Sequence, residues 1–584
     1  MVARHQWRSA TFEVEDLSDT FWVVSFEGTE ALSTPFEFEI QVAARHVDVS
    51  TLLGRFARLQ VLMRGEPRLV HGMILRAAYL DEYEPRALYR ITLVPWLYLL
   101  NMRTDCRIFV HKTVPEIVAA VLADVGVPKD WYHFDLNGAY PRREYCTQYR
   151  ESGLNFIHRL LEDEGIFYYF EHTERRHVVV FTDREGGGPK IVDPSLEFRP
   201  HGHAATREHI SRFSVSEELR PERVTMRGVN PYDASEGSIH FEESKTAPGS
   251  DRPSRENVLQ LYDFPAELRT QGDATTLVCR DLASVRATRR HGLGTSDCPR
   301  LAPGFAFTLG DHPLQELDDD YCVVRVHHVG SHPDMVDASA DHGLVYHNDF
   351  VCIGYKDAYR APRVTPRPTV RGVHAATVIR DHDPDKDDED SKDDVYTDEY
   401  GRVKVQFHWD HNENTRDTCW VPVSQAWAGK GFGALFLPRI GDKVLVEFFE
   451  GNPDRPVITG RLHYTFGPPP VALPDRRSRS TIRTETFGGG GFHEIRFEDQ
   501  PDAEQLLIRS QRDLDEFVVH DRRESVGNDD HRTIGNDRFE QVGRDQHTSV
   551  GRNAVAKVAE AADIHTGSLQ LQVDGAAIVG VGED

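Results

Sequence analysis

Clusters of histidine and acidic residues are the first places to look for chemistry in this chain. His201-Gly202-His203, with His209, has the composition of a metal site, but its loop has no cysteine or carboxylate at ligand spacing. The acidic run Asp381–Asp394 could offer oxygen ligands to Ca²⁺, but Pro384 interrupts it and the loop glycine of an EF-hand is missing. We therefore expect solvated loops at both places, with no metal and no cofactor.

The seven cysteines are the other source of nucleophilic or metal-binding side chains. They are odd in number, widely spaced and without a CxxC pair, which is typical of a reduced protein rather than a disulfide or zinc framework. We expect Cys106, Cys146 and Cys419 to be buried structural thiols. The sequence contains no GxSxG, HExxH or P-loop pattern. It therefore predicts no catalytic residue and no enzyme.

Length and charge limit the class of protein. At 584 residues the chain should hold three or four domains, at roughly 100–200 residues each. Lys and Arg total 68 against 94 Asp and Glu, a net charge of −26, and so acidic a surface repels nucleic-acid backbones and anionic lipid. No apolar run approaches the roughly 20 residues of a membrane span, and Met1–Asp16 lacks the apolar core of a signal peptide. We expect a protein made in the cytoplasm without a signal peptide and without a nucleic-acid partner.

A strict repeat of eight residues runs through the C-terminal part of the chain. A β-branched aliphatic residue opens each repeat, glycine directly follows four of them, and the next two positions are polar. An eight-residue period drifts around an α-helix, so this pattern favours short strands and tight turns, with glycine permitting a positive φ or close packing against another chain. The repeat positions are Val518, Val526, Gly527, Ile534, Gly535, Val542, Gly543, Val550, Gly551 and Val558.

One aliphatic residue in eight cannot build a core inside a single narrow ribbon. Such a strand buries its apolar edge only if other copies wrap against it, and its edges are otherwise open. A solenoid of one chain is the alternative, but turns of eight residues are too narrow to enclose a dry interior. The repeat therefore predicts an intertwined homotrimeric β-helix, with valines along the axis and charges outside.

Residues 371–466 show the pattern of a compact β-barrel. Apolar residues alternate with polar ones in two runs, the two-residue period of half-buried strands, and Gly and Pro separate the runs. Short strands of this kind predict a small closed barrel of the OB type. The alternating apolar residues are Val403, Val405, Phe407, Trp409, Val444, Val446 and Phe448.

Barrels of the OB type often hold single-stranded nucleic acid, which makes four aromatic residues candidate stacking platforms: Trp409, Trp420, Trp427 and Phe432. Residues 371–465, however, contain 12 Lys and Arg against 18 Asp and Glu, a balance of −6. The cationic groove that tracks a phosphate backbone is missing, so structural aromatics in the barrel wall are favoured.

The N-terminal block is the largest and reads as mixed but mostly β. Thr113 and Glu116 form a capping box that begins a helix, a second helix is expected from Leu154 to Glu164, and a third from about Ala274 to Arg290. The whole chain then divides into a base of residues 1–370, an OB-type barrel of 371–466, a Pro/Gly-rich neck of 467–500 and an octad-repeat needle of 501–584.

Several longer motifs, in order along the chain, resemble one known family. They include Ser25-Phe26-Glu27-Gly28-Thr29-Glu30-Ala31-Leu32-Ser33, Pro95-Trp96-Leu97, Arg107-Ile108-Phe109, Tyr396-Thr397-Asp398-Glu399-Tyr400-Gly401-Arg402-Val403-Lys404-Val405, Trp427-Ala428-Gly429-Lys430-Gly431 and Gly451-Asn452-Pro453-Asp454-Arg455-Pro456. With the octad repeat, the chain resembles VgrG, the valine–glycine repeat spike proteins of type VI secretion systems, which are similar to the hub and spike of contractile phage tails.

The resemblance implies a fold and a set of partners. The fold would be mainly β with a few helices: phage-hub-like tandem barrels, two related barrels per chain, then an OB-type barrel and an intertwined trimeric β-helix. The partners would be two further copies of the chain, the hexameric Hcp tube at the N-terminal base, and a PAAR-type tip protein and effectors at the C-terminal end, around Val579 and Val581. The spike would be ejected to the exterior or into target cells, with only transient membrane contact.

Three alternatives stay open at this point. One is the tail spike of a phage or of another contractile injection particle. A second is a trimeric adhesive fibre, although such fibres usually end in a globular head, whereas here the large block comes first. The third is a spike with hidden hydrolase activity, but the Gly467–Gly491 link is too short to hold a domain.

Overall fold

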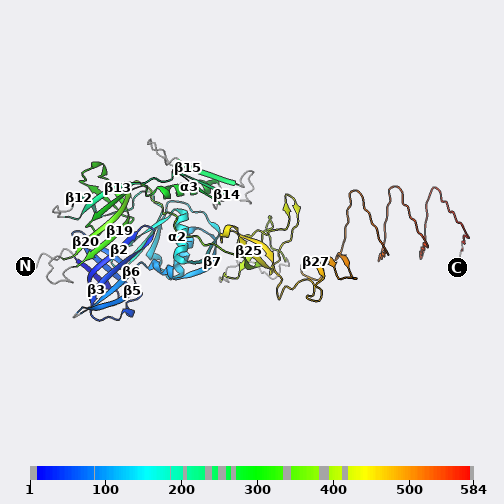
Figure 1. Ribbon diagram of the computed structural model, residues 1–584, viewed down its shortest axis with the longest axis horizontal. Coiled ribbons are helices and arrows are strands. Elements are labelled where there is room, and N and C mark those ends of the chain that lie inside the picture. The colour runs from blue at the N-terminus through cyan, green and yellow to red at the C-terminus, as the bar shows by residue number, and fades with distance from the viewer. Residues whose placement is uncertain are drawn as a thin grey trace, which may run out of the picture. The chain divides into compact units, whose positions relative to one another are not determined.

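The computed structural model describes residues 9–83, 86–184, 186–200, 207–229, 240–246, 258–264, 271–332, 343–380, 394–410, 419–578 and 580. Internal packing divides the chain into two units, Met1–Gln511 and Arg512–Asp584. The first unit holds all of the described helices and strands, and Figure 1 shows them as ribbons and arrows. Each unit is described by itself.

The first six strands close into a barrel. Apolar side chains alternate along them and point inward, as in β3, where Phe36, Phe38, Ile40 and Val42 are fully buried. The spatial order is β1-β4-β5-β6-β3-β2, and a pairing of β1 with β2 closes the ring. The strands are β1 (Ser9–Val14), β2 (Phe21–Ala31), β3 (Thr34–Ala44), β4 (Phe56–Leu62), β5 (Arg68–Tyr83) and β6 (Arg86–Val94).

A second six-stranded barrel repeats the strand order of the first, although β12 runs parallel to both of its neighbours whereas β1 is antiparallel to both of its own. Its spatial order is β12-β18-β19-β20-β17-β13, closed by β12 on β13, which is the order of β1-β4-β5-β6-β3-β2 with each strand replaced by its counterpart. The pairing of β2 with β19 fuses both barrels into one twelve-stranded sheet. This confirms the expected pair of related barrels. The strands are β12 (Lys190–Phe198), β13 (His209–Glu217), β17 (Arg290–Ser296), β18 (Ala306–Gly310), β19 (Asp320–Ser331) and β20 (Val345–Gly354).

Two helices and five strands connect the barrels and extend the core of the first. The Thr113 hydroxyl accepts from the Glu116 amide and the Glu116 carboxylate accepts from the Thr113 amide, so the predicted capping box is present. The second helix is capped by Ser152 and ends at Gly165, which is left-handed at φ 68°. The elements are α1 (Val114–Asp124), α2 (Gly153–Glu164), β7 (Thr104–Lys112), β8 (Tyr132–Asp135), β9 (Arg143–Ser152), β10 (Phe167–His172) and β11 (His177–Thr182).

The third helix differs from its expected range of about Ala274 to Arg290. Helix α3 (Gln271–Arg286) ends four residues earlier, because Arg290 already pairs with Glu217 as the first residue of β17. The helix packs through Ala274, Val278 and Leu282 against a small sheet inserted between β13 and β17. The strands of this sheet are β14 (Arg223–Val229), β15 (His240–Thr246) and β16 (Gln260–Asp263).

The described residues between 370 and 461 form the expected OB-type barrel. Four strands lie in the order β22-β21-β25-β26, and bridges from Val403 to Val421 and from Val423 to Ile458 close the sheet through the segment between them. The alternating residues Val405, Phe407, Val444 and Val446 fill its core. The elements are β21 (His374–Ile379), β22 (Lys404–Phe407), β25 (Lys443–Phe448) and β26 (Pro456–Arg461), with a hairpin of β23 (Ala428–Gly429) and β24 (Phe432–Gly433).

Three strands follow the barrel, where the sequence suggested only a neck. They form an antiparallel sheet of β27 (Arg479–Arg483), β28 (Glu494–Glu498) and β29 (Gln505–Arg509), which crosses the expected boundary between neck and needle. Short 3-10 helices complete the first unit: η1 (Val49–Thr51), η2 (Trp96–Met102), η3 (Lys129–Trp131), η5 (Gln315–Leu317) and η7 (Phe449–Gly451).

The second unit contains neither helix nor strand between residues 512 and 578. Its chain runs through a series of open turns, visible in the brown-to-red part of Figure 1. In the described part of the whole chain, no helix is long and apolar enough to cross a membrane.

Candidate functional site

The octad repeat sets the course of the second unit. The chain bends once in every eight residues, at the position that glycine occupies in most repeats, and the spacing continues past Val558 to Gly567 and Gly575. Between bends the backbone is extended. The bends lie at 519–520, 527–528, 535–536, 543–544, 551–552, 559–560, 567 and 574–575.

The octad aliphatic side chains share one environment. Val518, Val526, Ile534, Val542, Val550 and Val558 each expose between 46% and 57% of their surface. Most other apolar residues of this unit are more exposed, such as Val519 at 94% and Val555 at 90%, although Val573 is exposed at 46%. The repeat therefore places its aliphatic side chains on a common side of the turns, where they form an apolar line that a single chain leaves uncovered.

The octad glycines do not play the conformational role that the sequence suggested. Gly527, Gly535, Gly543 and Gly551 are absent from the residues with positive φ, so L-residues could adopt the same backbone. A Cβ at any of the four would meet nothing within 4 Å in the single chain. The positive-φ explanation is therefore wrong, and close packing against another chain is the reason for glycine that remains.

The backbone of this unit also lacks partners. Within the described residues 514–578, no backbone amide donates to a backbone carbonyl of the same segment. Extended backbone must find its hydrogen bonds in water or in neighbouring strands. Since one chain supplies no neighbour, paired strands in this region require other chains.

A second uncovered apolar surface precedes the repeat, and the sequence analysis missed it. Opposed residues of β27, β28 and β29 place five large apolar side chains on one face of the sheet, all exposed. The other face has charged residues, of which Glu494 is buried. The two-residue alternation in these strands was the available signal. The apolar face consists of Ile482, Ile495, Phe497, Leu506 and Ile508.

The family motif Gly451–Pro456 is a structural joint between the base and the OB-type barrel. The Asp454 carboxylate accepts from the Thr147 amide at 2.6 Å, and the Thr147 hydroxyl donates to the Pro453 carbonyl. Behind this contact the buried Arg159 pairs with Glu151 at 2.8 Å and donates to the Thr147 carbonyl. The motif thus holds two domains together.

The aromatic residues of the OB-type barrel divide into two groups. Trp409 stacks on Phe407 at 4.9 Å and donates to His374, and Trp420 stacks on Tyr396, so both are structural as expected. Trp427 and Phe432 instead lie exposed on the β23–β24 hairpin, outside the barrel wall. The expectation of a wall position was wrong for this pair, because the hairpin projects from the barrel.

The cysteine and histidine candidates have the following surroundings among the described residues. All seven cysteines are free; Cys146 and Cys419 are buried and Cys106 is half-buried. Among these residues no three His, Cys, Asp or Glu side chains converge on a metal position. His201, His203 and residues 381–393 lie outside the described residues, while His209 pairs with Asp297 at 3.2 Å.

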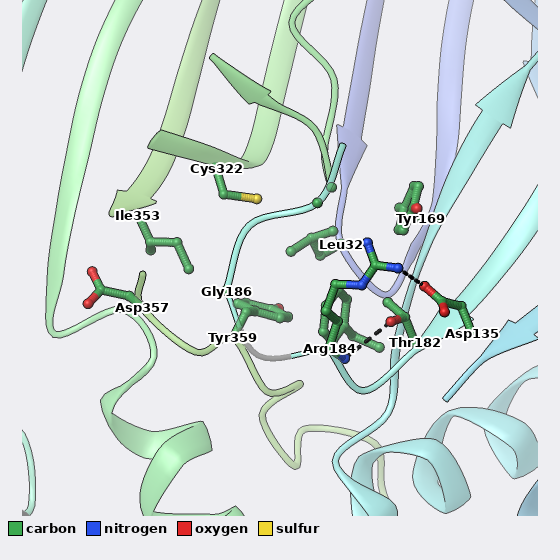
Figure 2. Close-up of a pocket in the computed structure, with 13 residues that line it drawn as sticks. Leu32, Asp135, Tyr169, Thr182, Arg184, Gly186, Cys322, Ile353, Asp357 and Tyr359 are labelled. Atoms are coloured by element: carbon green, nitrogen blue, oxygen red, sulfur yellow. Dashed lines mark hydrogen bonds and ion pairs between the residues drawn. The ribbon is translucent and has the colours of Figure 1, made fainter. Parts of the chain in front are cut away.

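One cavity lies between the second barrel and the β10–β11 sheet. Figure 2 shows the Arg184 side chain turned toward Asp135, and Cys322 and Ile353 pointing in from β19 and β20. Its volume is about 20 Å³, which is room for about one water molecule. Burial raises the pKa of the Cys322 thiol, so it stays protonated at neutral pH. Two other pockets of the described residues are larger: one of about 440 Å³ is lined by Arg212, His327 and Asp349, and one of about 180 Å³ by Arg159, Asp163 and Asp454.

A buried histidine cluster that the sequence gave no reason to expect lies between β5 of the first barrel and the β10–β11 sheet. His71 Nδ1 lies 3.3 Å from His177 Nδ1, and His172 Nδ1 accepts from the His71 amide. His177 also accepts from the Trp96 amide through Nε2. Burial lowers the pKa of His71 and, with the charges of its histidine neighbours, that of His177 well below its ordinary value. The cluster is therefore neutral near pH 7.

Acidification is expected to destabilise the first barrel. Unfolded histidine titrates near 6.5 and the folded cluster lower, with His172 at about 3, so the unfolded chain binds more protons as pH falls. The stabilisation is complete above about pH 6.5 and is lost progressively below it. Hydrogen exchange of β5 and β11, corrected for intrinsic rates, should accelerate between pH 7 and 5. His177→Gln should flatten this dependence and the exposed His46→Gln should not; equal profiles for parent and H177Q would contradict the prediction.

Three family models cover most of the chain. Residues 29–333 match the phage tail baseplate hub (GPD), residues 392–463 the type VI secretion system/phage-baseplate injector OB domain, and residues 480–584 the bacteriophage T4 gp5 C-terminal trimerisation domain. The third match includes both uncovered apolar surfaces.

Curated relatives decide the family. The type VI secretion system spike protein VgrG1a of Pseudomonas aeruginosa is 32% identical over 526 residues, which cover 87% of this chain and 78% of that protein. The chain belongs to the VgrG family. VgrG4b of the same organism is 35% identical over 532 residues, 89% of this chain and 64% of that protein, so the chain spans just under two thirds of the latter's length. The actin cross-linking toxin VgrG1 of Vibrio cholerae is 32% identical over 88% of this chain and 47% of its own length.

Solved structures show the same VgrG-type fold. An E. coli type VI secretion component described as similar to the T4 tail proteins gp27 and gp5 superposes with a TM-score of 0.53 at 21% identity, covering 77% of this chain and 100% of that one. The half-lidded Francisella PdpA–VgrG complex gives a TM-score of 0.55 at 8% identity over 87% of this chain and 89% of that one. With the trimerisation-domain match, the family membership supports a trimeric spike.

Proposed function

We propose that this chain is a non-enzymatic, homotrimeric membrane-puncturing spike of a type VI secretion system. Its N-terminal base sits on the hexameric Hcp tube, and its C-terminal end holds a PAAR-type tip protein or effectors. The observation that supports this most strongly is the uncovered apolar line of the octad repeat, which requires neighbouring chains. Made in the cytoplasm, the spike leaves the cell with the contracting apparatus.

The two equivalent barrels support a base that matches a sixfold tube. Each chain contributes two barrels of the same strand order, so three chains contribute six. A trimer can then present a ring with approximate sixfold symmetry to a hexameric partner, although its own symmetry is only threefold.

The division of the chain into functional parts is likewise a proposal. Residues 1–370 form the base, 371–466 the OB-type barrel, 467–500 the neck and 501–584 the needle. The needle axis is built by the octad residues Val518 to Val558. Val579 and Val581, the proposed tip-binding end, lie outside the described residues.

The needle explains why such a protein could act mechanically without chemistry. In an intertwined trimer each chain's backbone groups pair with the other two chains, so separating one chain breaks many hydrogen bonds together. The three aliphatic lines then meet along a dry axis, and the charged residues between bends face water.

The experiment that tests the proposal is release of Hcp by the bacterium that encodes this chain. Deletion of its gene should abolish Hcp in the culture supernatant while intracellular Hcp persists, and the parent chain should restore release. Purified parent protein should retain immobilised Hcp hexamers. Undiminished release in a strain lacking this chain would contradict the secretion role. Clear murein hydrolysis by the purified protein would contradict the non-enzymatic one.

A further inference from the structure

The two barrels of the base repeat the same irregularities as well as the same strand order. β2 has a one-residue bulge at Val24 opposite β3. β13 has one at Ser211 opposite β17, which is the counterpart of β3. β5 has a bulge at Leu75 and β19 has one at Val324. Since bulges are specific features of a strand, they align β2 with β13 and β5 with β19 residue by residue.

Inside one chain the barrels are joined by the antiparallel pairing of β2 with β19. This junction runs from Ser25 opposite Ser331 to Ala31 opposite Arg325. It uses only the part of each strand that its own barrel leaves unpaired, because β1 pairs only with Phe21 and Trp22 of β2. The junction therefore shows which edge of each barrel is built to accept a neighbouring barrel.

The counterparts of the two junction strands are β13, which corresponds to β2, and β5, which corresponds to β19. Their corresponding edges have no partner strand among the described residues. β12 pairs only with the first two residues of β13, His209 and Ile210, and β4 pairs with β5 only over residues 68–73. In the described part of the chain no strand pairs with the remaining edge of residues 212–217 or of residues 76–82. Open strand edges of this length are templates for pairing with another chain.

We propose that the open edge of β13 pairs with the open edge of β5 from a second copy of this chain. Because β13 aligns with β2 and β5 aligns with β19, the register of the internal junction predicts the register of the proposed one. Ser216 lies opposite Ala78 of the neighbouring copy, and Glu218 lies opposite Arg76. Three such junctions alternate with three internal ones and close a ring of six barrels. The proposal rests on the trimeric spike proposed above and identifies the strands that join its base.

Charge complementarity favours this partner and this direction. Glu218 and Arg76 carry opposite charges at one end of the proposed junction. At the other end the transferred register places Arg212 opposite Glu82. The second bulge of β5, at Leu80, shifts this pair by one residue. Opposite charges across antiparallel strands stabilise the pair, and like charges would destabilise it. All four side chains are exposed in the single chain.

Disulfide trapping in the full-length protein tests the register. Directly opposed residues have Cα atoms about 4.5–5.5 Å apart, within disulfide range. The variant Ser216→Cys/Ala78→Cys should convert, on mild oxidation, from single chains to covalent trimers in a non-reducing gel. The matched control is Ser216→Cys/Arg90→Cys: Arg90 lies opposite Ala78 on β6, one strand further away, so its Cα should be about 10 Å from Ser216 and should not cross-link. The parent protein, oxidised in the same way, shows how much cross-linking its own cysteines produce.

The outcomes separate this inference from the proposed function. Covalent trimers from S216C/A78C but not from S216C/R90C support the pairing. A protein that is trimeric under reducing conditions but cross-links in neither variant, or equally in both, overturns the pairing and leaves the trimeric spike intact. A monomeric parent protein overturns the spike and the junction together. Charge reversal by Arg76→Glu should lower the cross-linking yield in S216C/A78C, and adding Glu218→Arg should restore it; no loss on reversal would contradict the proposed register.

Discussion

Val542→Asp is expected to prevent assembly of the needle. Val542 is the best-covered of the octad residues in the single chain, and in a trimer its three copies would meet on the axis. Three carboxylates would then be buried together without partners, and each unpaired buried charge costs on the order of several kcal/mol. The purified variant should be monomeric, or should dissociate at a lower temperature than the parent, when its mass is measured in solution.

Val555→Asp is the matched control for this substitution. It makes the same chemical change in the same segment, but Val555 is almost fully exposed and stands where other repeats have Arg523, His531 and His547. This variant should remain trimeric. If V542D assembles and resists heating like the parent, or if both variants dissociate equally, the axial position of the octad residues is wrong.

Ile508→Asp is expected to dissociate the protein, and its neighbour Leu507→Asp is expected to have the smaller effect. Ile508 belongs to the apolar face of the β27–β29 sheet and is 61% exposed in the single chain, whereas Leu507 lies on the opposite face and is half-buried. In an isolated chain the more buried Leu507 should matter more. In a trimer the apolar faces of three sheets cover one another, and burying an Ile side chain contributes about 1.5–3 kcal/mol in each copy.

The order of the two effects therefore distinguishes a lone sheet from an assembled one. Thermal dissociation followed by light scattering should show a large loss for I508D and a small one for L507D. The reverse order would mean that the apolar face is not an interface, and that the β27–β29 sheet lies outside the trimer contact.

The sequence was most informative in the octad repeat, where the structure depends on short-range spacing. Each octad has the same local environment, so the spacing from Val518 to Val558 was enough to place the bends and the apolar line. The OB-type barrel was also predictable, because Val405, Phe407 and Val444 alternate within strands whose one face is buried.

Features that depend on distant residues were not predictable in the same way. The end of α3 is set by the pairing of Arg290 with Glu217, which lies 73 positions earlier in the sequence and leaves no local signal. The His71–His177 contact joins β5 of the first barrel to β11 of a separate sheet, and these residues approach each other only in the folded protein. The apolar face of β27–β29 did have a local pattern, but its strands are only five residues long and the glycines between them suggested a linker.

The mass of the full-length protein in solution tests the central claim most directly. Sedimentation equilibrium at neutral pH should give three times the chain mass of 66.4 kDa, or 199.2 kDa, and the value should not change over a wide range of protein concentrations. A folded species of 66.4 kDa would contradict the account, because the apolar line of the repeat and the apolar face of the β27–β29 sheet would then be stable without any chain to cover them.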